Sequence, residues 1–383
     1  MNEPTPSPLH AAPLQSARLV LPCRELSPLL DFLTGTLGLK LERIFPADAP
    51  AVADLTGLGL NLRLSRQTAG AVTPAHLLIT AALGDWPADA PRVLHGPEGW
   101  TAELVDSAVN IEVPPGHQAF VVSRLRGQAG TPAAAKGEGE AADVDEAWGV
   151  GRAGMLYRDL IPDRLGGRFI ASHIAIPQGG PVPDYVHYHH VRFQMIFCKA
   201  GWVRLVYEDQ GEPFVLEAGD CVLQPPGIRH RVLEASPGLE VVEIGCPAIH
   251  ETCLDAELEL PNATLHPERL FGGQKFVRHI DAAAPWQPAP GWPEGAEARD
   301  TGIGAATFGL ARVQVVRNAP GFRGALQHKG EFRLLFVLDG TMTFASAARG
   351  EHTLSTGDSV VLPAEETFSV VSAGGFRALE VAL

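Results

Sequence analysis

The chain has 383 residues, of which 45% are hydrophobic and 19% charged, and its formal net charge is -14 at pH 7. This length allows two or three domains with separate cores. The negative charge, without any Lys/Arg cluster, excludes nucleic acid as an expected partner. The opening "MNEPTPSPLH" has no signal-peptide pattern and no apolar run approaches the ~20 residues of a membrane span. We therefore expect a cytoplasmic protein that does not bind a membrane.

The cysteines favour a reduced protein. The chain has five, with no CxxC pair: Cys23, Cys198, Cys221, Cys246 and Cys253. Each lies in or beside an apolar segment, which is typical of buried thiols. We expect reduced core cysteines rather than a disulfide framework or a zinc knuckle.

Residues 16–126 are predicted to form a small α+β module. "ARLVLPC" is typical of a strand, and "ELSPLLDFLTGTLGL" predicts an amphipathic helix that ends at Gly38. "VADLTGLGLNLRLS" and "GPEGWTAELVDS" predict further strands. The expected order is β-α-β-β-β.

Two stretches read as linkers. Residues 127–147 are rich in Gly, Ala and acidic side chains without an apolar period, which indicates a solvated connector. Residues 281–298 are proline-rich, and Trp286 and Trp292 suggest that this linker packs on a domain surface. The cuts leave two further domains, 148–280 and 299–383.

These two domains are diverged copies of one fold. Arg158-Asp159 corresponds to Arg299-Asp300, and the offset then stays nearly constant. The matched pairs are His189 with His328, Gly201 with Gly340, Gly219 with Gly357, and Pro225 with Pro363. Both copies are short β-branched and aromatic runs divided by Gly and Pro, so we predict a mainly β fold used twice, as an antiparallel sandwich or barrel.

A metal site is predicted where "HYHH" precedes an apolar run. On a strand, His187 and His189 point to the same side while His190 points away. Gln194 has the opposite parity and joins them only if a bulge or turn intervenes. A Pro-Pro-Gly turn downstream directs His230 back, and three neutral imidazoles suit a borderline divalent metal.

These residues resemble the two motifs of the cupin superfamily. The first motif is met by Gly180 one residue early, His187, His189, Gln194 in place of glutamate, and Gly201. The second is met by Gly219, Pro225, Gly227 and His230, with Glu234 where the family often has Asn. The resemblance implies two double-stranded β-helix barrels, with the metal inside the barrel of residues 148–280.

The copy over 299–383 resembles a cupin barrel that has lost its site. His328 is retained, but the other ligand positions hold Leu326, Arg333 and Phe368. A fixed cation at ligand distance repels a metal ion. We expect a scaffold, a dimer partner or an anion pocket, and a homodimer is one expected assembly.

The N-terminal module resembles, more faintly, one module of the vicinal oxygen chelate (glyoxalase-like) superfamily. Glu103 matches the closing glutamate of that family, but its first ligand position offers Arg18 or Cys23 instead of histidine. A single carboxylate does not make a metal site. We expect a scaffold or a ligand-binding accessory module.

Gln194 removes one negative charge from the predicted site and leaves a weak carbonyl donor. Such a site suits an anionic, chelating substrate. The resemblance to gentisate-type dioxygenases, which are bicupins with a three-histidine iron site, implies an oxygenase with Fe(II), or with Mn, Ni or Zn, acting on a small acid or enol. The residues predicted to assist are Arg192, Arg229 and Arg231 for substrate binding and His173 for acid/base chemistry or as a structural residue. A non-enzymatic binding or sensing cupin and a Zn/Mn isomerase remain open alternatives.

Overall fold

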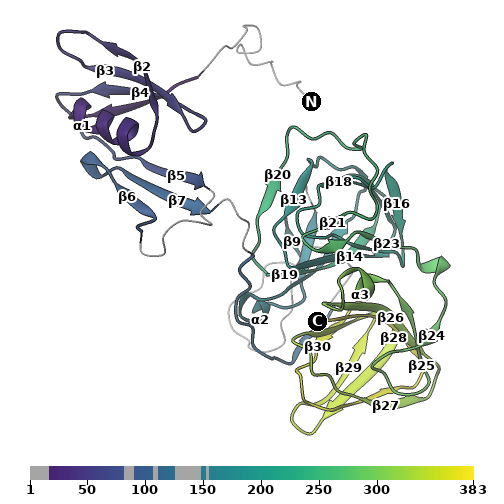
Figure 1. Cartoon of the computed structure of the whole chain (residues 1–383). Helices are drawn as coiled ribbons and strands as arrows, with labels where there is room; N and C mark the ends of the chain where they lie inside the picture. The colour runs from purple at the N-terminus through teal and green to yellow at the C-terminus, as the bar shows by residue number, and fades with distance from the viewer. Residues whose placement is uncertain (1–16, 82–89, 107–110, 126–147, 152–154) are drawn as a thin grey trace. The chain divides into compact units, whose positions relative to one another are not determined.

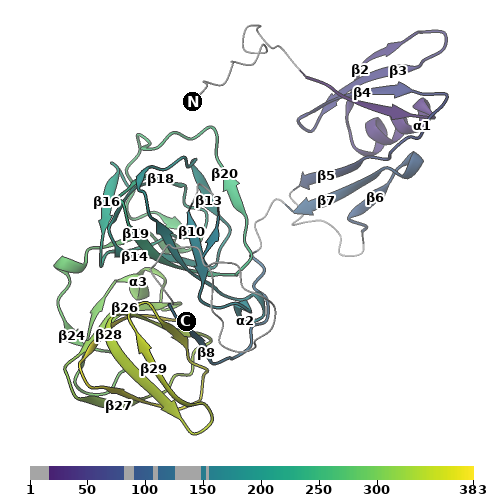
Figure 2. The ribbon, with the colours of Figure 1, turned by 180° about the vertical axis from the view of Figure 1, so that it is seen from behind.

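The computed structural model describes residues 17–81, 90–106, 111–125, 148–151 and 155–383 (Figures 1 and 2). The chain divides into two units, Met1–Asn110 and Ile111–Leu383. The module predicted over 16–126 therefore ends at residue 110, and 111–125 belongs to the second unit. The predicted linker 127–147 lies outside the described residues. Within the described ranges, no helix has the length and apolar character needed to cross a membrane.

The first unit contains the predicted helix and strands, but the predicted β-α-β-β-β order is incomplete, because the structure has three further strands, at Lys40–Phe45, His76–Ala81 and Val93–His95. Its elements are β1 (Leu19–Cys23), α1 (Leu26–Asp31), the π-helical turn η2 (Phe32–Thr36), β2 (Lys40–Phe45), β3 (Val52–Gly57), β4 (Leu60–Arg66), β5 (His76–Ala81), β6 (Val93–His95), η3 (Pro97–Gly99) and β7 (Thr101–Asp106). The sheets have the orders β1-β4-β3-β2 and β5-β7-β6. Leu29 and Leu33 bury the helix face against β3 and β4. Gly38 ends the helical segment with φ of +75°, a conformation that suits glycine.

The first barrel of the second unit is formed by two facing sheets. Their orders are β23-β17-β14-β19-β11-β10-β9 and β16-β15-β18-β13-β20, with β12 also on β18. The elements are β9 (Gly149–Val150), β10 (Leu156–Asp159), α2 (Arg164–Gly167), β11 (Ile170–Ile176), β12 (Gly180–Pro181), β13 (His187–His189), β14 (Phe193–Ala200), β15 (Trp202–Tyr207), β16 (Phe214–Glu217), β17 (Cys221–Leu223), β18 (His230–Ala235), β19 (Leu239–Cys246), β20 (Thr252–Leu254), β21 (Leu270–Phe271), β22 (Gln274–Lys275) and β23 (Val277–His279).

The second barrel repeats this plan. Its sheet order is β24-β25-β26-β32-β28-β30-β8, with β27 on β31 and with β29 and β31 on β28. The elements are β8 (Val121–Ser123), η5 (Asp281–Ala283), β24 (Gln287–Pro288), β25 (Ala296–Asp300), α3 (Ile303–Ala306), β26 (Arg312–Asn318), β27 (Phe322–Leu326), β28 (Arg333–Ser346), β29 (Gly350–Ser355), β30 (Ser359–Val361), β31 (Phe368–Ser372) and β32 (Phe376–Ala382).

Two predicted boundaries change because strands cross them. β8, which precedes the first barrel in sequence, pairs with β30 of the second barrel. The proline-rich linker 281–298 contains β24 and the start of β25, so the second barrel begins inside it. The prediction that this linker packs on a domain surface is confirmed, since Trp286 and Trp292 pack against two different apolar clusters of the unit.

The two barrels share a core. One face of β14, β19 and β11 packs against one face of β28, β32 and β26, with α3 between the barrels in Figures 1 and 2. The rings of Phe169 and Phe332 stack across this interface at 4.3 Å between centroids. The opposite faces of these strands line the two barrel interiors. Strands with both faces buried carry nearly continuous apolar runs, which explains "FQMIFC" and "VVEIGC".

The internal repeat is confirmed by strand register. Ile196 pairs with Glu243 between β14 and β19, and Leu335 pairs with Glu380 between β28 and β32. Gly201 and Gly340 follow at equivalent places with φ of +71° and +78°. An added Cβ at Gly201 would lie 2.4 Å from the Ser236 hydroxyl, so glycine is required for backbone geometry and for space.

Candidate metal centre

The three predicted histidines converge inside the first barrel. His187 and His189 are the ends of β13, and His230 begins β18 directly opposite His187 in the antiparallel register. All three are buried. The ring centroids of His187 and His230 are 4.3 Å apart, and one nitrogen from each ring lies within 4.8 Å of the others. That spacing fits one small cation.

Main-chain carbonyls select the tautomer of each ring. The Nδ1 contacts are His187 with the Tyr185 oxygen at 2.7 Å, His189 with the Glu251 oxygen at 3.2 Å and His230 with the Ile228 oxygen at 3.0 Å. Because a carbonyl only accepts, Nδ1 donates in every case, and the lone pair of each neutral ring lies on Nε2. Neutral, oriented imidazoles are what a divalent metal requires.

Asp184 supports the first of these rings. Its carboxylate lies 3.6 Å from Nδ1 of His187 and accepts a hydrogen bond from the Val232 amide at 3.0 Å. Asp184 is buried. A carboxylate beside the distal nitrogen raises the basicity of a ligating imidazole.

Gln194 joins the histidines because a turn intervenes, as its parity required. It lies on β14, which belongs to the other sheet from β13, and residues 190–192 connect the two strands. Its Nε2 donates to Glu243 at 2.7 Å, whereas its Oε1 is buried and has no hydrogen-bond partner among the described residues. An orphaned buried carbonyl beside three neutral imidazoles fits a bound cation.

Glu243 is the residue that sequence reasoning missed. It lines the same pocket as the histidines, so the site is not without a negative charge as the Gln194 substitution suggested. The carboxylate is not on β14, at the position that Gln194 occupies. It is on the neighbouring strand β19, from which it contacts Gln194. The available signal was a single acidic residue in the apolar run "VVEIGC".

The pocket around these groups is small and largely apolar. Its volume is about 80 Å³. Two further polar side chains enter it, Tyr207 and Gln224. The Tyr207 hydroxyl and both amide atoms of Gln224 are buried, and they have no hydrogen-bond partner in the part of the chain that the structure describes. Burial, with a smaller effect of the Glu243 charge, raises the pKa of Tyr207, so the phenol stays protonated. The remaining lining residues are Met155, Tyr157, Ile174, Ile176, Ile196, Val203, Leu205, Val232, Leu239 and Val241.

His173 does not face this pocket. Ile174 and Ile176 line it, so their neighbour on β11 points the other way, toward the second barrel. There the His173 ring lies 5.2 Å from that of Phe336. Arg158 Nη2 lies 3.2 Å from Nδ1 and Glu240 lies 2.7 Å from Nε2. The alternative of a structural histidine therefore agrees with its position.

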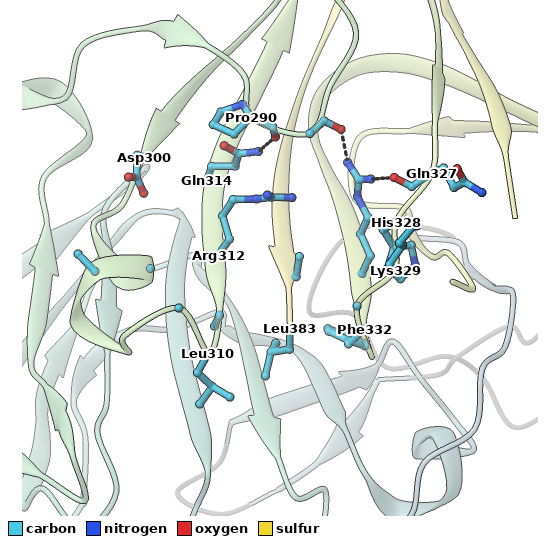
Figure 3. Close-up of a pocket in the computed structure, with 18 residues that line it drawn as sticks. Pro290, Asp300, Leu310, Arg312, Gln314, Gln327, His328, Lys329, Phe332 and Leu383 are labelled. Atoms are coloured by element: carbon cyan, nitrogen blue, oxygen red, sulfur yellow. Dashed lines mark hydrogen bonds between the residues drawn. The ribbon is translucent and has the colours of Figure 1, made fainter. Parts of the chain in front are cut away.

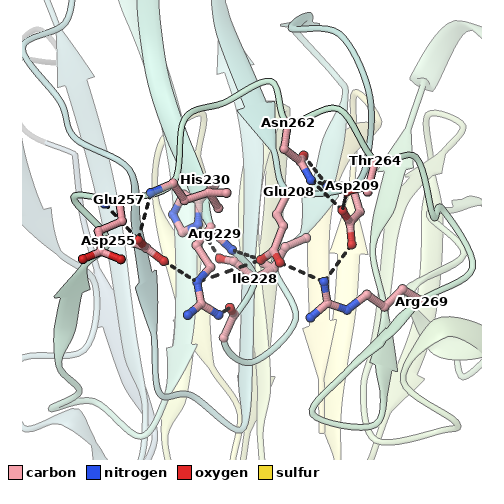
Figure 4. Close-up of polar contacts among 12 residues, drawn as sticks. Glu208, Asp209, Ile228, Arg229, His230, Asp255, Glu257, Asn262, Thr264 and Arg269 are labelled. Atoms are coloured by element: carbon pink, nitrogen blue, oxygen red, sulfur yellow. Dashed lines mark hydrogen bonds and ion pairs between the residues drawn. The ribbon is translucent and has the colours of Figure 1, made fainter.

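The three arginines also lie outside the pocket lining. Arg192 pairs with Glu331 of the second barrel at 2.5 Å. Figure 4 shows Arg229 directed at Asp255, to which its Nε donates at 3.1 Å. Arg231 follows His230 on β18 and so points to the opposite face of that strand. The structure does not bring the predicted substrate-binding arginines to the metal-site pocket.

In the second barrel, the equivalent positions are filled differently. Leu326 pairs in register with Phe368, as His187 does with His230, and both belong to the apolar core. Arg333 forms a buried ion pair with Glu380 at 2.6 Å. The adjoining pocket has a volume of about 640 Å³, and Figure 3 shows Arg312, Gln314 and His328 among the residues that line it. Arg333 also lines this pocket and donates to the Gln327 carbonyl at 3.3 Å.

Comparison with known proteins agrees with this description. Residues 172–244 match the family model described as the cupin domain. The matched segment contains His187, His189 and His230, so the first barrel is a cupin domain with a candidate metal site. The second barrel repeats the strand registers of the first, so the chain contains two barrels of the same fold. The match does not reach the N-terminal unit, whose glyoxalase-like resemblance stays a prediction.

No curated protein matches the sequence. Solved structures that resemble it include a salicylate 1,2-dioxygenase from Pseudaminobacter salicylatoxidans, with 15% identity and a TM-score of 0.44 over 56% of this chain and 71% of that chain. Protein Ylba from E. coli has 12% identity and a TM-score of 0.46, over 62% and 87%. The oxalate decarboxylase of Lactobacillus farciminis, in a formate complex, has 15% identity and a TM-score of 0.46, over 64% and 87%.

Proposed function

We propose that the protein is a metal-dependent cupin oxygenase that acts on a small chelating acid or enol. The observation that carries this proposal is the set of three buried imidazoles whose ligand atoms lie within 4.8 Å of one another. His187, His189 and His230 would hold the metal, and Gln194 would offer its unpartnered carbonyl as a fourth, labile ligand. Fe(II) is the proposed metal, with Mn, Ni or Zn as the other candidates.

The bound metal would supply Lewis acidity toward a chelating substrate and a redox couple for O₂. The chain supplies the rest. Glu243 holds the Gln194 amide through a 2.7 Å hydrogen bond, so that the amide oxygen rather than the nitrogen faces the ligand side. The apolar walls exclude water, which strengthens every electrostatic contact in the pocket.

Tyr207 and Gln224 are the proposed substrate contacts. Both enter the pocket with buried polar atoms that have no partner in the described residues. A protonated phenol donates to a carboxylate or enolate oxygen, and an amide both donates and accepts. A substrate with two or three oxygens would satisfy these groups, which removes the cost of leaving them unpaired.

The volume limits the substrate. A protein cavity of about 150 Å³ accommodates benzene, whereas this pocket measures about 80 Å³. The barrel in this conformation therefore suits a chelating acid or enol of two to four carbons better than an aromatic acid. A keto acid or a short diketone meets both the size and the oxygen count.

The test combines metal analysis with oxygen uptake. The protein is reconstituted anaerobically with Fe(II), and O₂ consumption is measured with pyruvate, oxaloacetate and butane-2,3-dione, with salicylate as the size control. We expect one iron per chain at the three histidines and O₂ uptake that depends on a small substrate. Zn or Mn with substrate turnover and no O₂ uptake would identify an isomerase instead. Ligand binding without turnover under any metal would identify a binding or sensing cupin.

A Tyr207→Phe variant sharpens the test. We expect it to keep its iron and to lose at least about tenfold in kcat/KM, because one hydrogen bond to the substrate is removed. Tyr157→Phe serves as the control, because it removes a hydroxyl from another residue that lines the same pocket. Equal losses in both variants would argue against a specific role of Tyr207.

A further inference from the structure

A second group of metal-binding side chains lies on the outer face of the strand pair that carries the histidine site. β13 pairs with β20 so that Tyr188 faces Cys253 and His189 faces Thr252. Alternation directs His187 and His189 inward and His190 outward. His190, Glu251 and Cys253 come together on that outer side, with one ligand atom of each within 4.8 Å of the others.

The spacing of these atoms fits tetrahedral coordination. His190 Nδ1 lies 3.3 Å from Glu251 Oε2, and Cys253 Sγ lies 3.9 Å from each of them. In a tetrahedral zinc site, bond lengths of about 2.3 Å to sulfur and about 2.0 Å to nitrogen and oxygen place the ligand atoms ~3.3–3.6 Å apart. A shift of a few tenths of an ångström at the sulfur completes that geometry.

The surroundings allow a cation to enter. The Glu251 side chain is 79% exposed and that of His190 is 25% exposed, so the cluster opens to solvent. The nearby cation is Arg229, which stacks over the Tyr188 ring at 4.1 Å. Its charge is balanced by Asp255 at 3.1 Å and Glu208 at 4.0 Å. The cluster itself contains one carboxylate and one thiol, which favour a divalent ion.

We propose that His190, Glu251 and Cys253 form a second metal site, for a thiophilic borderline divalent cation such as Zn²⁺, with water as the fourth ligand. The sequence-based expectation placed Cys253 among buried core thiols, but it is partly exposed, whereas the other four cysteines are buried. Burial and the Glu251 charge raise the pKa of the Cys253 thiol, so the metal-free thiol keeps its proton. Metal binding therefore releases the thiol proton to solvent as the Sγ–metal bond forms.

This outer site is coupled to the inner one through Glu251. The main-chain oxygen of Glu251 accepts the hydrogen bond from His189 Nδ1 at 3.2 Å. β20 is the last strand of its sheet, and within the described ranges it pairs with β13 on one side only. A metal that joins His190 to Glu251 and Cys253 would tie β20 to β13 and keep the carbonyl in place behind the ligand His189.

Cobalt titration of the whole chain tests the outer site. Co²⁺ bound to a thiolate gives a near-ultraviolet charge-transfer band that histidine and carboxylate ligands do not give. We expect wild type to show this band and to bind two metal ions per chain. Cys253→Ser is expected to lose the band and one equivalent, and His190→Gln to weaken binding at this site at least about tenfold. Glu257→Gln, an exposed neighbour outside the cluster, is the control.

The same titration in His187→Ala separates this proposal from the proposed function. That variant is expected to lose the inner equivalent and to keep the thiolate band. The outer site would be refuted if wild type gave no such band, or if Cys253→Ser kept both the band and two equivalents. Circular dichroism of each variant shows that it is folded, so that a lost equivalent reports on ligation.

Discussion

The two barrels of the second unit share strand registers but differ at three of the four positions where the first barrel gathers its candidate metal ligands. His187, His189, Gln194 and His230 of the first barrel correspond to Leu326, His328, Arg333 and Phe368 of the second. Both barrels keep a glutamate at one position of their last long strand, Glu243 and Glu380, and that glutamate contacts Gln194 in one barrel and Arg333 in the other.

This difference shows how one carboxylate serves two purposes. In the first barrel it holds a neutral amide whose carbonyl remains available to a cation. In the second it neutralises a buried guanidinium, and Trp292 donates a further hydrogen bond to it at 2.8 Å. A protein cation in the place of a metal ion satisfies the same buried glutamate without any cofactor.

The largest expected effect comes from removing a histidine of the inner site. His187→Ala should weaken metal binding more than about 100-fold, because losing a ligand costs more than losing an outer-sphere partner. His328→Ala, at the corresponding region of the second barrel, should leave metal binding unchanged. Metal content after dialysis measures both. Equal loss in the two variants would contradict the assignment of the site to the first barrel.

Breaking the buried ion pair of the second barrel should reduce stability. Glu380→Gln leaves the guanidinium of Arg333 buried without its counter-charge, and we expect a loss of about 3–5 kcal/mol in the free energy of unfolding. Glu243→Gln in the first barrel removes a carboxylate whose partner is neutral, so the loss should be about 1 kcal/mol. Urea denaturation compares them, and similar losses would contradict the different roles of the two glutamates.

The interface between the barrels should be sensitive to acid through His173. Arg158 can only donate to Nδ1, so the ring is neutral and its Nε2 donates to Glu240. Burial, and secondarily the Arg158 charge, lower the pKa of His173 to about 4 from the ordinary 6.5. Between these values the unfolded chain binds a proton that the folded chain does not. The contribution of His173 to the free energy of unfolding is therefore fully present above pH 6.5, and the free energy of unfolding falls by about 3 kcal/mol as the pH approaches 4.

A His173→Gln variant isolates this contribution, because glutamine can accept from Arg158 and donate to Glu240 without titrating. The difference in unfolding free energy between wild type and variant should change between pH 7 and pH 4. A constant difference over this range would mean that His173 does not titrate with a lowered pKa. Glu240 itself titrates below this window, since its hydrogen bonds to His173 and Lys199 lower its pKa to about 2 despite burial.

The smallest expected effect comes from exchanging the amide and the carboxylate of the inner site. Gln194→Glu alone places two carboxylates in contact and should destabilise the metal-free protein, since only one of them can ionise readily. The double variant Gln194→Glu/Glu243→Gln restores one amide and one carboxylate. It should regain stability and bind metal about tenfold more tightly, because an anion then contacts the cation. Unchanged affinity would mean that Gln194 does not contact the metal.

Much of the fold and of the inner site followed from the sequence alone. Motif spacing predicted that His187, His189 and His230 converge, and a nearly constant offset identified the second barrel and the residues at its equivalent positions. These predictions depend on strand alternation and on turns rich in glycine and proline. Both are local properties, so the chain itself carries them.

Only the tertiary structure decided which face of each strand lines the interior of its own barrel and which face packs against the other barrel. β11, β14 and β19 are buried on both sides, by their own barrel interior and by the other barrel. Strand alternation therefore predicts that His173 and Ile174 face opposite sides of β11, but it does not predict which of the two faces the cavity. For the same reason Glu243 and Tyr207 were recognised only in the folded chain, where residues distant in sequence supply the partners that define their roles.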